Sequence, residues 1–123
     1  MNYLSIDFGT KFIGLAYSIN GIIFTIKSIP NDSNATDTIH TLTKTHTIGK
    51  IYVGLSTGRV AKLTQNFIKD LLAVIKLPIE TVEESVSTIE AGQLLIQSKS
   101  KKRNYKKLVD SVSAAVILQR VIS

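Results

Sequence analysis

A few acidic residues of this 123-residue chain have the placement that metal-assisted hydrolysis requires. Asp7 comes near the end of an alternating apolar segment, and Glu83 and Glu84 end a later one. Asp110 lies on the otherwise apolar stripe of a C-terminal segment with helical periodicity, and a carboxylate there needs a partner or a metal. Mg²⁺ and Mn²⁺ prefer oxygen ligands, and a pair of such ions can activate water and stabilise the leaving oxygen of a phosphodiester. These acids therefore predict a divalent-metal site.

Simpler interpretations of the same residue types stay open. Asp110 also fits a helix N-terminus, where the dipole favours acids, and Asp7 also fits a turn. His40 and His46 have no carboxylate at metal-ligand spacing, so we expect both to be exposed positions on a helix.

The positive charge of the chain is concentrated in one segment. Its formal net charge is +6, from 15 Lys and Arg against 9 Asp and Glu. Six basic residues follow one another without an intervening acid: Lys99, Lys101, Lys102, Arg103, Lys106 and Lys107. The other nine basic residues balance the nine acids. This basic run suggests a polyanionic partner, and a solvated charge run is the alternative.

Composition excludes several classes of protein. The chain has no Cys, which rules out disulfide scaffolds, thiolate zinc sites and Cys nucleophiles. It has no apolar run near 18 residues and no charged-then-apolar leader, so we expect neither a membrane span nor a signal peptide, and a cytoplasmic location. Its length suits one hydrophobic core, and we expect a single domain over residues 1–123.

The elements that must position the acids can be read from the periodicity of the chain. Residues 2–8 and 12–18 alternate as the strands of a hairpin, and Asn20-Gly21 favours a type I′ turn into a third strand over 21–27. We then expect a weak helix over about 34–46, a strand over 50–55, a helix whose apolar stripe includes Val60, Leu63, Phe67, Leu71 and Val74, and a strand over 79–83. A helix beginning at Ser87, a basic loop and a last helix opened by Asp110 complete a mixed α/β sheet covered by helices.

Four motifs in order resemble those of the YqgF (RuvX) family of pre-ribosomal-RNA nucleases, also described as Holliday junction resolvases. The first is LSIDFGTKFIGLAYS over residues 4–18, and the second is IYVGLSTG over 51–58. The third, VEESVSTIEA over 82–91, resembles the D-E-R-x-T-T-x-E-A motif of the family. The fourth is the basic run leading into VDSVSAAVILQ over 109–119.

The resemblance implies a ribonuclease H-like fold with a mixed five-stranded sheet, and a nuclease that processes the 5′ end of precursor 16S ribosomal RNA. It implies Asp7, Glu84 and Asp110 as catalytic and metal-binding acids for Mg²⁺ or Mn²⁺, with Glu83 as the substitute for Glu84. Because the basic run lies directly before Asp110, we also expect it to contact nucleic acid together with Lys11; its residues are Lys99, Lys101, Lys102, Arg103, Lys106 and Lys107. We expect a monomer or homodimer with a nucleic-acid partner and no membrane.

The sequence also departs from the family pattern. Phe12 and Ser85 replace Arg residues, Ser56 replaces the Pro of G-L-P, and Ile19 replaces an acid. Fewer Arg residues mean fewer fixed phosphate contacts, so a nucleic-acid-binding or ribosome-assembly factor without catalysis stays an alternative, as does a nuclease for branched DNA. The D-x-G-T motif at Asp7 also opens the phosphate loop of the sugar kinase, actin and Hsp70 superfamily, which needs two related domains.

Overall fold

The computed structural model describes residues 1–55, 58–83 and 105–122, with the backbone alone for 105–111. The elements in chain order are β1 (Asn2–Phe8), β2 (Phe12–Ile19), β3 (Ile22–Pro30), α1 (Ala35–Thr45), β4 (Ile48–Leu55), α2 (Arg59–Val74), β5 (Ile79–Glu83) and α4 (Tyr105–Ile122). The five strands form one sheet in the order β3-β2-β1-β4-β5. The first three strands are antiparallel, and β4 and β5 are parallel to β1. This arrangement confirms the expected mixed sheet.

The turn between β2 and β3 shows why the chain reverses there. Asn20 and Gly21 have φ values of 52° and 81°, the left-handed conformation that a type I′ turn requires at both central residues. The third strand extends beyond the expected residue 27 to Pro30, which pairs with Phe12. Proline is tolerated there because β3 is an edge strand and this is its last residue.

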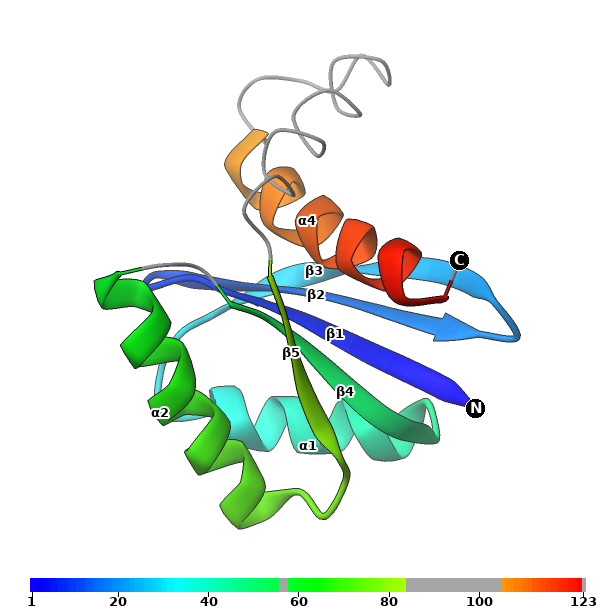
Figure 1. Cartoon of the computed structure of the whole chain (residues 1–123), viewed down its shortest axis with the longest axis horizontal. Coiled ribbons are helices and arrows are strands. Elements are labelled where there is room, and N and C mark those ends of the chain that lie inside the picture. Colours follow the sequence, from blue (N-terminus) through cyan, green and yellow to red (C-terminus); the bar gives the residue numbers. More distant parts are fainter. Residues whose placement is uncertain (56–57, 84–104, 123) are drawn as a thin grey trace.

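Helices cover the two faces of the sheet unequally. α1 and α2 lie on one face and α4 crosses the other (Figure 1). The larger apolar cluster lies under α1 and α2, and its buried members are Leu4, Ile6, Phe8, Ile13, Leu15, Ala35, Ile39, Ile48, Ile51, Val53, Phe67, Leu71 and Ile75. The smaller cluster lies under α4 and is formed by Ala16, Tyr52, Ala114, Ile117 and Leu118.

Strand alternation therefore divides β1 between the two layers. Leu4 and Ile6 belong to the cluster under α1 and α2. Tyr3 packs with the α4 cluster, and the Ser5 hydroxyl contacts the backbone of α4. Asp7 has the parity of Tyr3 and Ser5, and so it lies on the face that α4 covers.

Two helices differ from expectation. α4 begins at Tyr105, so Lys106 and Lys107 belong to the helix and not to a loop, and Asp110 lies in the second turn instead of opening the helix. No Pro or Gly lies between Tyr105 and Asp110 to stop the helix from starting early. On α2, Thr64 is buried, whereas Leu63 and Val74 are exposed despite their place on the predicted apolar stripe.

Thr64 fits the core because its hydroxyl donates a hydrogen bond of 2.8 Å to the Val60 carbonyl oxygen of its own helix. The hydroxyl is thereby satisfied without a partner from another element. The helix expected to begin at Ser87 lies outside the described residues. Within the described helices, none is long and apolar enough to span a membrane.

An ion pair joins β4 and β5 on the α4 face, at the end of these strands away from Asp7. Lys50 Nζ lies 2.8 Å from Glu80 Oε2 and 5.0 Å from the centroid of the Tyr52 ring. The hydrogen bond to Glu80 raises the pKa of the Lys50 ammonium above its ordinary value, against a smaller lowering by desolvation. This pair ties the edge strand β5 to the sheet.

Candidate active site

Asp7 is the penultimate residue of the central strand β1, and glycines flank it on both sides. It pairs with Gly14 on β2 and with Gly54 on β4. Both glycines are buried, and Asp7 is half-buried. Neither neighbouring strand therefore places a side chain directly opposite this carboxylate. The sheet beside Asp7 is backbone at both paired positions, and α4 forms the layer above this face.

The sequence contained a signal for these glycines that motif reasoning did not use. Gly14 and Gly54 each interrupt an apolar strand segment, FIGLAYS and IYVGLS. An isolated glycine inside a strand indicates a close approach of another group or a bulge. Gly14 and Gly54 both pair with Asp7, the one acid on β1.

The loop after Asp7 is fixed by Asn31, a residue that sequence reasoning also missed. Its side-chain amide donates a hydrogen bond of 2.9 Å to the Gly9 carbonyl oxygen, and its backbone N–H donates to the Lys11 carbonyl oxygen at 2.9 Å. A side chain at Gly9 would collide with the Phe12 carbonyl oxygen. The exposed Lys11 is thereby held on a defined loop at the Asp7 end of the sheet.

The end of β5 lies at the same edge as Asp7, because β1, β4 and β5 are parallel. Val82 pairs with Gly54 and Glu83 with Leu55. Val82 thus shares the face of Asp7 and packs with the α4 cluster, while Glu83 has the opposite parity and is exposed. The Glu83 carbonyl oxygen accepts a hydrogen bond of 3.3 Å from Arg120. This register does not favour Glu83 as the substitute ligand, and Glu84 lies outside the described residues.

Ser5 connects the sheet to α4 close to Asp7. Its hydroxyl donates to the Ala114 carbonyl oxygen at 2.6 Å and lies 3.4 Å from that of Ala16. Ser5 is fully buried. Asp110 precedes Ala114 by one helical turn, and α4 runs back across β1 in the opposite direction (Figure 1). The backbone of Asp110 therefore lies toward the Asp7 end of β1.

The basic run is placed only in part. Lys99, Lys101, Lys102 and Arg103 lie outside the described residues. Lys106 and Lys107 belong to the first turn of α4. The helix brings these two residues to the N-terminal end of α4, before Asp110. Their contact with nucleic acid remains a prediction.

Both histidines differ from the expected exposed positions, because each is half-buried on the face opposite Asp7. The His46 ring stacks on the Tyr17 ring at a centroid distance of 3.8 Å, and Tyr17 stacks in turn on Phe24 at 5.2 Å. His40 lines a pocket beside α1. Neither histidine belongs to a group of three metal-ligating side chains within the described residues.

The donor chemistry of this region fits a divalent cation. Asp7 is the one proposed ligand whose side chain lies at the site within the described residues, and its carboxylate supplies the hard oxygen donor that Mg²⁺ and Mn²⁺ prefer. Gly14 and Gly54 leave backbone on both sides of it. A second carboxylate above the sheet, on α4, would complete an oxygen-rich site.

Comparison with known proteins gives consistent results. A family model described as "RuvX: Holliday junction resolvase" matches residues 1–123. A protein of Roseiflexus sp. (strain RS-1) named "Putative pre-16S rRNA nuclease" is 31% identical, covering 94% of this chain and 89% of its own. One of the same name from Sulfurihydrogenibium sp. (strain YO3AOP1) is 36% identical, covering 94% and 86%.

Solved structures show the fold. T. thermophilus RuvC in complex with a Holliday junction has a TM-score of 0.62 at 12% identity, covering 99% of this chain and 97% of its own. The fowlpox virus resolvase with junction DNA has a TM-score of 0.57 at 13% identity, covering both chains fully. These neighbours confirm the expected ribonuclease H-like fold.

Proposed function

Because this chain belongs to the RuvX family, we propose that it is a metal-dependent nuclease that processes the 5′ end of precursor 16S ribosomal RNA. The observation that carries this proposal is the position of Asp7 between two glycines, at the carboxyl end of the central strand and beneath the α4 layer. The substrate is proposed from the names of relatives that span nearly the whole chain.

Asp7, Glu84 and Asp110 would hold the cation, which we propose to be Mg²⁺ or Mn²⁺. When bound, such ions activate water and stabilise the leaving oxygen of a phosphodiester. Asp7 offers carboxylate oxygens at a fixed strand position. Ser5 supports the site indirectly, because it fixes the height of α4, the helix that carries Asp110, above the sheet.

Nucleic-acid binding would depend on Lys11 and the basic run. Lys11 is exposed on the loop that Asn31 holds at the Asp7 end of the sheet, so its ammonium can meet a phosphate near the acids. Lysine binds phosphate as a point charge, without reading the base sequence. The positive charge would offset the repulsion between the carboxylates and the RNA backbone.

Cleavage of two substrates by the purified protein tests this function. We expect the protein to shorten the 5′ end of precursor 16S ribosomal RNA with Mn²⁺ or Mg²⁺, and to be inactive with a chelator, because removal of the metal leaves water unactivated. The readout is the 5′ end of the product, mapped by primer extension. If the protein cleaves a four-way DNA junction and leaves the precursor RNA uncleaved, the branched-DNA alternative is favoured instead. Binding to both substrates without cleavage in either metal would favour an assembly factor.

A further inference from the structure

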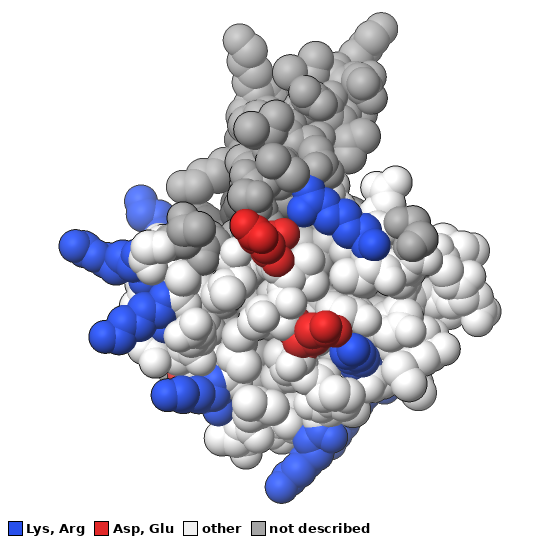
Figure 2. All heavy atoms as spheres, in the orientation of Figure 1, with Lys and Arg blue, Asp and Glu red and all other residues white. Residues whose placement is uncertain are grey.

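α2 carries a line of basic residues along its most exposed side. Arg59 opens the helix, Lys62 and Lys69 follow on it seven residues apart, and Lys76 lies two residues past its end at Val74. Seven residues are about two helical turns, or about 10.5 Å along the axis. All four are exposed, and Figure 2 shows blue side chains projecting along the side where Figure 1 places α2.

The opposite side of α2 explains why these residues face solvent. Thr64, Phe67 and Leu71 are buried against the sheet, and Lys62 and Lys69 lie on the other side of the helix. Asp70 is the one acid on α2. Within the described part of the chain, none of the four basic residues forms an ion pair. The line of charge is therefore available to an external anion.

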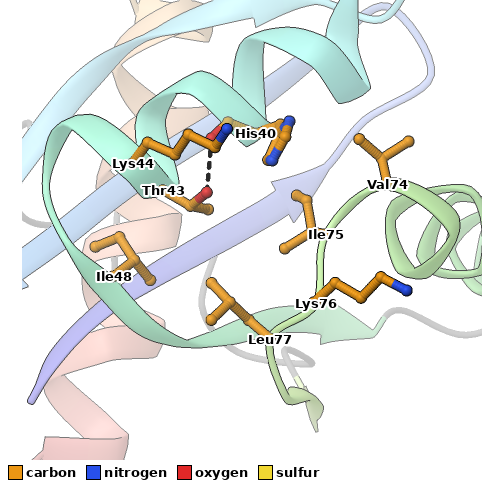
Figure 3. Close-up of a pocket in the computed structure, with 8 residues that line it drawn as sticks. All are labelled: His40, Thr43, Lys44, Ile48, Val74, Ile75, Lys76 and Leu77. Carbon is orange, nitrogen blue, oxygen red and sulfur yellow. Dashed lines mark hydrogen bonds between the residues drawn. The ribbon is translucent and has the colours of Figure 1, made fainter.

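The basic line continues across a pocket onto α1. A pocket of about 320 Å³ lies between α1 and the segment that follows α2. Lys76 borders it on one side and Lys44 and His40 on the other (Figure 3). Its remaining lining is mostly apolar, with Ile48, Val74, Ile75, Leu77 and Thr43. Cationic groups beside an apolar lining suit a nucleotide, whose phosphates are charged and whose base is flat and largely apolar.

The position of this surface separates it from the proposed active site. α1 and α2 cover the sheet face opposite Asp7 (Figure 1). Arg59 follows shortly after β4, whose carboxyl end lies at the Asp7 edge of the sheet. The basic line thus begins near that edge and leads away from it over the 16 residues of α2, a length of about 24 Å.

We propose that Arg59, Lys62, Lys69 and Lys76 on and after α2, with Lys44 across the pocket, form a second RNA-binding surface. The inference rests on the proposed function and extends it: the surface holds a single-stranded segment that leads away from the cleavage site, and the pocket accepts an unpaired base. The neutral total charge outside the basic run conceals this surface, because acids elsewhere on the molecule balance these lysines.

Binding of a labelled single-stranded RNA of about 20 nucleotides to the full chain, measured by fluorescence anisotropy in chelator, tests this surface. The variant Lys62→Gln/Lys69→Gln/Lys76→Gln is expected to raise Kd roughly tenfold or more at low salt. It should also reduce the slope of log Kd against log salt concentration by about 2, because each lost phosphate contact in single strands removes about 0.7. Asp70→Asn should lower Kd.

Lys27→Gln is the matched control, since Lys27 is exposed on the edge strand β3, away from α2. Its slope should equal that of the unmodified chain. An unchanged Kd and slope in the triple variant would overturn the inference, as would binding to vesicles of anionic lipid with no binding to RNA. Chelator separates binding from cleavage. If the unmodified chain cleaves RNA and the triple variant binds RNA with unchanged affinity, this surface alone is refuted. If the triple variant binds RNA more weakly and the unmodified chain cleaves in no metal, the proposed function alone is refuted.

Discussion

Asp7→Asn is expected to lower metal-dependent cleavage of precursor ribosomal RNA on the order of 10³-fold, with RNA affinity and stability nearly unchanged. An amide has the size of a carboxylate but lacks its charge, so it is a poor ligand for a hard cation. Loss of one group that acts on charge in the transition state costs about 10² to 10³ in rate, and more where the metal itself is lost. Initial rates with Mn²⁺ and with Mg²⁺ measure the effect.

Asp37→Asn is the control for this substitution. Asp37 is exposed in the first turn of α1, on the layer opposite Asp7. The change removes the same charge and should leave the cleavage rate within about twofold, since surface changes away from a site have small effects. A similar rate for Asp7→Asn and the unmodified chain would refute the assignment of the site.

Ser5→Ala is expected to lower the free energy of unfolding by about 1–3 kcal/mol. The Ser5 hydroxyl is fully buried and donates the 2.6 Å hydrogen bond that joins β1 to the Ala114 carbonyl oxygen of α4. Removal of the Ser5 hydroxyl takes this hydrogen bond from the buried Ala114 carbonyl oxygen, and the loss of a buried hydrogen bond costs about this much free energy. Denaturation by urea, followed by circular dichroism, measures the change.

Ser28→Ala is the matched control, because Ser28 is buried on β3 and its hydroxyl has no hydrogen-bond partner among the described residues. Removal of an unsatisfied buried hydroxyl is expected to be neutral or stabilising. Equal destabilisation by the two variants would contradict the role given to the Ser5 hydrogen bond and indicate a general intolerance of the sheet to the lost oxygen.

Local signals were sufficient to predict most of the fold. Alternation defined β1 and β2, and Asn20-Gly21 defined their connection to β3 because that turn requires positive φ values. Long-range packing was harder to predict. The apolar stripe expected on α2 included Leu63 and Val74, which are exposed, and omitted Thr64, which is buried. A Thr hydroxyl bonded within its own helix is compatible with a core, and the amino-acid type does not show this.

The side of the sheet on which Asp7 lies was predictable, and its surroundings were not. Strand parity was sufficient to place Asp7 on the face opposite Leu4 and Ile6, and the structure shows that α4 covers this face. The pairing of Asp7 with Gly14 and Gly54 depends on the register of three strands, one of them distant in sequence. The hydrogen bond from Asn31 to Gly9 likewise joins residues that only the folded hairpin brings together. Net charge along the sequence does not reveal the basic surface on α2, because folding separates acidic from basic side chains in space.

The most direct test of the central claim, a divalent-metal site at Asp7, is paramagnetic broadening of backbone amide NMR signals by substoichiometric Mn²⁺. We predict that the signals of Asp7, Gly14 and Gly54 broaden first, and that those of Asp37 on α1 and Asp70 on α2, in the opposite layer, remain sharp. The broadening should disappear in Asp7→Asn. Sharp signals around Asp7 at saturating Mn²⁺, or equal broadening in Asp7→Asn, would contradict the claim.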